Sequence, residues 1–253
     1  MTSLLRQRAL SGSQPTFGPL RFIEALPWIV LAAALRVIAF SGGPVALFAV
    51  IGASIAILQA FIAVARRSIE LADGQTDLGN LTLKDELRLS LRILGLIALL
   101  MAIGVVSVIW TGNAGLSGSM IAGLDGMAFD QFTHLGKFWS ATVAALVLLM
   151  LLHAERHAGR INLLDVIGEL IDRWRWFGGA IVVLGGFYFG LSLTQGVVRT
   201  AIWATWQGET SQTFLRNLVF FVFIFSFAMI RLWITLTVLT WGLRQSYWHA
   251  QQD

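Results

Sequence analysis

The stretch FFVFIFSFAMIRLWITLTVLTWGL, residues 220–243, decides the fold of this chain. Its residues are almost all apolar, and the one charged side chain among them is Arg231. A helix needs about 20 mainly apolar residues to cross the hydrocarbon core of a bilayer. The stretch is long enough, so it predicts a transmembrane helix with a charge near its centre.

The composition extends this prediction to the whole chain. Of 253 residues, 57% are hydrophobic and 13% are charged, whereas about a quarter of the residues of an average soluble domain are charged. Tryptophan occurs 10 times and tyrosine twice, and tryptophan is enriched at membrane interfaces. The lipid bilayer is therefore the expected partner. Arginines placed beside membrane spans account for the net charge of +4, so no nucleic-acid partner is expected.

Six segments are apolar and long enough to span a membrane, which predicts an all-α, polytopic transmembrane helical bundle. Gly42-Gly43-Pro44 predicts a tight hairpin between the first two spans. A single transmembrane domain would occupy residues 21–248, with an N-terminal tail at 1–20 and a C-terminal tail at 249–253. The predicted spans are residues 22–40, 44–65, 93–110, 135–153, 177–198 and 215–243.

Basic residues are strongly biased to one side of these spans. Cytoplasmic loops carry an excess of lysine and arginine, so both termini are expected in the cytoplasm and the protein in a bacterial inner membrane. The first twenty residues have no apolar core, so no cleavable signal peptide is expected. The outer side would hold Lys137, Arg199 and Arg216. The cytoplasmic side would hold Arg6, Arg8, Arg21, Arg66, Arg67, Lys84, Arg88, Arg156, Arg160, Arg173, Arg175 and Arg244.

Two segments ahead of predicted spans are alike. TLKDELRLSLRILG begins at Thr82 and NLLDVIGELIDRWRWFGG at Asn162, with Asp85 and Asp165 three residues later. Each pairs an N-cap residue with an acid in the first helical turn, which predicts a cytoplasmic amphipathic helix leading into a span. With a weaker copy from Thr16, the pattern indicates three hairpin repeats. The alternative to a repeat is that any polytopic protein needs such helix caps, and needs basic residues where its spans return to the cytoplasm.

Through these two segments, the chain resembles bacterial integral membrane proteins built of repeated amphipathic-helix and hairpin units. One such family is the membrane domain attached to some glycerophosphodiester phosphodiesterases. The resemblance covers most of the chain and implies this topology. The chain has no phosphodiesterase catalytic domain, so the resemblance does not imply that activity.

Arg231 is the main candidate for a specific role. It stands ten residues before Trp241, about 15 Å at helical rise, which places it near the bilayer midplane. A charge there costs about 2.5–3.5 kcal/mol on insertion scales, so it should face protein or water. Its candidate partners are Gln59, Glu24 and an acid on another subunit. An internal contact or snorkelling, a transport or ligand site, and an intersubunit contact all remain open. Arg36, in the first span, is expected to snorkel outward.

Glycines in the fifth span predict close helix packing. Gly186 and Gly190 form a GxxxG pair, and Gly178 and Gly179 stand at the start of the span. Small residues let a neighbouring helix approach closely. Packing within the protein is expected in preference to a subunit interface, although the latter remains an alternative.

Aromatic residues in the external loops predict a docking face. Phe129 and Phe132 lie in the long loop before the fourth span, and Trp203 and Trp206 follow the fifth. Exposed apolar groups of this kind often mark a surface for another protein. A re-entrant lid over the protein's own helices is an equal alternative.

His153 and His157 lie on one helical face, as two ligands of one metal would. Zinc sites generally use three or four protein ligands, and only His249 shares their predicted compartment. No metal or other cofactor is therefore expected. The two histidines fit better as part of the basic segment in which the fourth span ends on the cytoplasmic side.

These features favour a non-catalytic role. No serine-nucleophile elbow, phosphate-binding loop or HExxH motif occurs, and the absence of cysteine excludes thiolate catalysis. We expect an accessory, assembly or scaffold subunit that contacts other subunits of a larger membrane complex. The alternative is a small-solute or anion transporter or channel that uses Arg231. A third hypothesis is a redox or pigment-binding subunit that uses His153 or His157.

Overall fold

The computed structural model describes residues 23–39, 43–71, 83–110, 134–157, 160–205 and 213–249. All the regular structure in these segments is α-helical, which confirms the predicted all-α class. The seven helices are α2 (Leu26–Ala39), α3 (Gly43–Leu71), α4 (Leu83–Trp110), α7 (His134–Arg156), α8 (Leu163–Asp172), α9 (Trp174–Thr205) and α10 (Thr213–His249).

Four of these helices are long and apolar enough to cross a membrane, as expected of a membrane-embedded protein. They are α3, α7, α9 and α10, with apolar segments Pro44–Ala65, Gly136–Ala154, Trp174–Thr205 and Phe214–Ser246. These segments agree with the second, fourth, fifth and sixth predicted spans.

The first predicted span, residues 22–40, corresponds to a shorter helix. α2 has 14 residues, about 21 Å at helical rise, against a hydrocarbon core of about 30 Å. It begins at Leu26 because Pro27 is tolerated only in a first helical turn. α4 has 28 residues and begins ten residues before the third predicted span, so residues 83–110 form one continuous helix. It is not among the four helices found long and apolar enough to cross a membrane in the described part of the chain.

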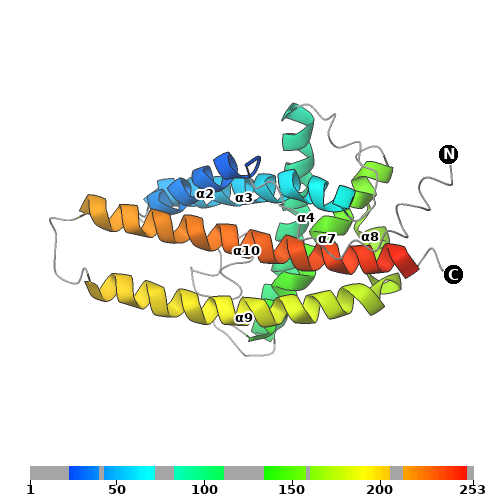
Figure 1. Ribbon diagram of the computed structural model, residues 1–253. Helices are drawn as coiled ribbons and strands as arrows, with labels where there is room; N and C mark the ends of the chain where they lie inside the picture. Colours follow the sequence, from blue (N-terminus) through cyan, green and yellow to red (C-terminus); the bar gives the residue numbers. More distant parts are fainter. Residues whose placement is uncertain are drawn as a thin grey trace.

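Figure 1 shows α9 and α10 running antiparallel, and α2 and α3 lie alongside α10. α4 and α7 cross the direction of these four helices. α7 is the most enclosed of the four long helices, because 78% of its apolar segment is buried. For α9 and α10 the buried shares are 22% and 28%. Their exposed side chains are largely apolar, as on surfaces that face lipid.

Two glycines set the spacing between helices. A Cβ added at Gly242 on α10 would lie 3.0 Å from Cβ of Ala180 on α9. A Cβ added at Gly185 would lie 2.5 Å from the ring of Phe138 on α7. Because carbon atoms pack at about 3.5–4.0 Å, neither site has room for a side chain. Gly242 therefore sets the α9–α10 distance, and Gly185 the α7–α9 distance.

α8 confirms the amphipathic helix expected before the fifth span. Oδ1 of Asn162 accepts a hydrogen bond from the backbone N–H of Leu164 at 3.2 Å, as an N-cap does. Val166 and Leu170 are buried, whereas Leu164 and Ile171 are exposed. α8 therefore has one apolar face against the bundle and a second that faces outward. Thr82, the other predicted cap, lies outside the described residues.

Candidate functional site

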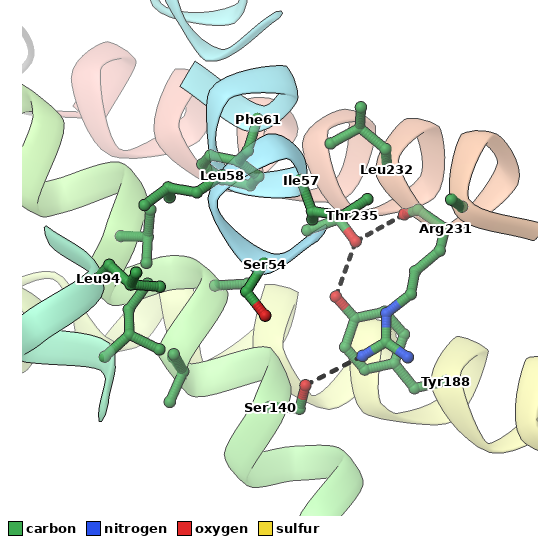
Figure 2. A pocket seen from close by; sticks show the side chains of 15 residues that line it. Ser54, Ile57, Leu58, Phe61, Leu94, Ser140, Tyr188, Arg231, Leu232 and Thr235 are labelled. Atoms are coloured by element: carbon green, nitrogen blue, oxygen red, sulfur yellow. Dashed lines mark hydrogen bonds between the residues drawn. The ribbon is translucent and has the colours of Figure 1, made fainter. Parts of the chain in front are cut away.

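Arg231 lies near the middle of the apolar segment of α10 and makes contacts inside the bundle. Its Nη2 donates a hydrogen bond to Oγ of Ser140 on α7, at 3.0 Å. Its guanidinium carbon lies 4.1 Å from the ring centroid of Tyr188 on α9, within the range of a cation–π contact. Figure 2 shows the guanidinium lying against this ring. The guanidinium on α10 is therefore partly buried and contacts side chains of α7 and α9.

Thr235, one turn after Arg231, connects this group to Tyr188. Its hydroxyl donates to the backbone carbonyl of Arg231 at 2.7 Å, and the hydroxyls of Thr235 and Tyr188 lie 2.7 Å apart. Since Thr235 has one hydroxyl proton, the proton in the second bond comes from Tyr188. These bonds hold the tyrosine ring in place against the arginine (Figure 2).

The cavity beside this cluster has a volume of about 110 Å³. Its polar lining residues are Arg231, Ser140, Tyr188, Thr235 and Ser54. All its other lining residues are apolar, and they come from α3, α4, α7 and α10 within the described chain. The cavity therefore has a polar, cationic end and an apolar body.

A second buried basic residue lies on α7, close to Ser140 in sequence. Lys137, one turn before Ser140 on α7, is 6% exposed, and its Nζ lies 5.5 Å from the ring centroid of Phe189, next to Tyr188. Lys137 is therefore a buried residue of α7, which the sequence did not predict. Gly136 and Ser140 on the same helix are buried as well.

The expected partners of Arg231 lie elsewhere. Nε2 of Gln59 on α3 donates to Oγ of Ser90 on α4 at 2.7 Å, so Gln59 joins these two helices. Glu24 is exposed in the turn before α2. Arg36 is partly buried in the last turn of α2, where a positive charge complements the helix dipole. Of the four predicted intramembrane polar residues, only Arg231 lines the cavity.

The glycines divide into two groups. The tryptophan ring of Trp174 lies 3.0 Å from a Cβ added at Gly178, whereas nothing lies within 4 Å of one added at Gly179, Gly186 or Gly190. Among the described residues, then, no neighbouring helix packs on the GxxxG pair. The internal packing expected at this pair is not seen in that part of the chain.

The predicted docking face is described only in part. Trp203 is exposed over 45% of its surface, and its ring lies 5.4 Å from that of Phe220. This contact joins the end of α9 to the start of α10. Trp206, Phe129 and Phe132 lie outside the described residues.

The two histidines stack on each other. Their ring centroids are 4.1 Å apart with planes 24° from parallel, and Nδ1 of His157 lies 3.0 Å from the carbonyl oxygen of His153. Nearly parallel rings direct their nitrogen lone pairs side by side instead of toward one ion. Among the described residues, no group of three metal-ligating side chains occurs.

Sequence reasoning missed Ser140, Tyr188, Thr235 and the buried position of Lys137. A weak signal was present, since Tyr188 is one of two tyrosines and lies inside a predicted span. The sequence does not show which helices meet, so it could not bring these residues to Arg231. In comparisons with known proteins, no family model matches this chain, and no curated protein or solved structure is significantly similar to it.

Proposed function

We propose that this protein is a non-catalytic integral membrane protein that serves as an accessory, assembly or scaffold subunit of a larger membrane complex. The observation that carries the proposal is the open face of α9 at Gly186 and Gly190. Both glycines are exposed and line a groove of about 460 Å³ with Val183, Phe187, Leu191, Thr194 and Ile234.

A transmembrane helix of a partner protein fits this groove chemically. Inside a bilayer, helices gain little from burying apolar surface, and they associate through close van der Waals contact at small residues. Gly186 and Gly190 allow such an approach, and the apolar residues beside them supply contact area. A partner helix would therefore bind along α9 at this pair.

Leucine at Gly186 or Gly190 is expected to remove the partner without harming the fold. A Cβ at either position meets nothing within 4 Å among the described residues, but a partner helix could no longer approach. Stoichiometric partners should co-purify with the wild-type protein in mild detergent, and their yield should fall at least about tenfold in either variant, as expected for a lost contact of about 1.4 kcal/mol.

Gly196→Leu is the matched control, because Gly196 is also open and exposed on α9 but does not line the groove. It should retain the partner. A wild-type protein that purifies alone and monodisperse would contradict the scaffold proposal. A partner retained in Gly186→Leu would contradict the role of this face.

We further propose six spans in a bacterial inner membrane, with both termini in the cytoplasm. Nη1 of Arg173 donates to Oγ of Ser246 at 2.7 Å, which brings the start of α9 and the end of α10 together. Arg175 and Arg244 belong to the same two helix ends, consistent with a cytoplasmic basic side. In α4, the segment 93–110 has no charged residue.

Cysteine labelling tests this topology cleanly, because the chain has no cysteine of its own. In intact spheroplasts, an impermeant maleimide should label Ser117→Cys and Ser211→Cys, which lie in the predicted outer loops. Gln251→Cys should be labelled only after permeabilisation. Labelling of Gln251→Cys in intact cells would contradict the proposed orientation.

A further inference from the structure

The polar end of the cavity is chemically suited to an anion. The guanidinium of Arg231 has its donors in a planar fork that matches carboxylate and phosphate oxygens. Ser140 accepts its hydrogen bond from Arg231, so its own hydroxyl proton can be donated to a further acceptor. The buried Lys137 adds positive potential nearby, and no acidic residue lines the cavity among the described residues.

The remaining walls restrict the kind of anion that fits. They are formed by aliphatic and aromatic side chains on several helices, including Ile57, Leu58, Phe61, Leu94 and Leu232 (Figure 2). A small inorganic anion would lose its hydration here and find donors on one side only. An apolar chain attached to the anion would instead gain from contact with these walls.

We propose that this cavity binds the headgroup of an anionic amphiphile, a carboxylate or a phosphate carried on an acyl or alkyl chain. The headgroup lies against Arg231 and Ser140, and the first carbons of the chain lie against the apolar walls of α3 and α4. A volume of about 110 Å³ holds this part of the ligand but not a whole lipid. The cavity does not include Gly186 or Gly190, so the proposal goes beyond the scaffold role and is independent of it.

Binding of a defined amphiphile to the full chain tests the proposal. The protein is purified in dodecyl maltoside, whose headgroup is neutral, and equilibrium binding of radiolabelled dodecanoate is measured against empty micelles. Dodecanoate or dodecyl phosphate should bind at about one molecule per chain, and the tighter of the two identifies the headgroup. Dodecanol, which lacks the charge, and acetate, which lacks the chain, should not bind measurably.

Variants locate the site. Arg231→Gln should weaken binding at least about tenfold, because hydrogen bonds to charged groups are the strong ones. Ser140→Ala should weaken it by a smaller factor. The matched control is Arg36→Gln, since Arg36 is also a partly buried arginine in an apolar helix but does not line the cavity; its affinity should equal the wild-type value.

Ala144→Phe gives an answer if the arginine variant fails to fold. Ala144 is partly buried and lines the cavity, so a phenyl group there should fill it and abolish binding while every polar residue remains. Equal binding of dodecanol and dodecanoate would overturn the proposal. Wild-type affinity in either Arg231→Gln or Ala144→Phe would overturn it as well.

Discussion

Leucine in place of Gly242 is expected to destabilise the protein by about 3 kcal/mol, the upper end of the usual cost of overpacking a core. The first atom of the new side chain would already lie 3.0 Å from Cβ of Ala180 and 3.7 Å from the carbonyl oxygen of Trp176. Both atoms belong to the α9 backbone or are bonded directly to it, so no rotamer change can move them aside. α9 and α10 would have to separate.

Thermal unfolding in detergent measures this effect. The matched control is Gly179→Leu, because a Cβ at Gly179 meets nothing within 4 Å. That variant should melt at the wild-type temperature or slightly above it, because removing a glycine from a helix contributes up to about 1 kcal/mol. If Gly242→Leu and Gly179→Leu melted alike, the α9–α10 contact at Gly242 would not be as tight as described.

The contact between Gly185 and Phe138 should show strong coupling. Gly185→Leu is expected to cost about 2–3 kcal/mol, because a Cβ there would lie 2.5 Å from Cδ1 of the phenyl ring. Phe138→Ala removes the obstacle, so the double variant should be more stable than the sum of the single changes predicts. A coupling energy of about 1–3 kcal/mol is expected for such neighbours.

A double-mutant cycle on unfolding free energies checks this prediction. Amphiphile binding can be measured in the same variants, because Phe138 lies two residues before Ser140 on α7. A shift of α7 away from α9 would move Ser140 from Arg231 and weaken amphiphile binding in Gly185→Leu. Additive effects of the two substitutions would show that the ring yields freely, and the predicted coupling would be wrong.

The pattern of apolar residues predicted the helices well, because membrane spans are defined by length and composition. The second predicted span, residues 44–65, agrees with the apolar segment of α3. α2 is shorter than predicted because hydropathy does not register where Pro27 starts the helix. The cap at Asn162 was also predicted correctly, since capping depends on residues close together in sequence.

Contacts between helices could be predicted from the sequence much less well. The sequence predicted that Arg231 faces protein or water, but Gln59, one of its three candidate partners, bonds elsewhere. Gln59 bonds to Ser90 because α3 packs on α4 there, and which helix faces which depends on the whole bundle. The burial of Lys137 was missed for the same reason, because a charge at the start of an apolar segment is normally read as its boundary.

The enclosure of α7 has a consequence for biogenesis. Its surface is covered mainly by α9, with smaller contributions from α4, α8 and α10. Three of these four neighbours are synthesised after α7, so during translation its buried face, with Lys137 at one end, has little to pack against. We infer that the chain completes its insertion as a late, concerted assembly of α7 with α9 and α10, rather than hairpin by hairpin.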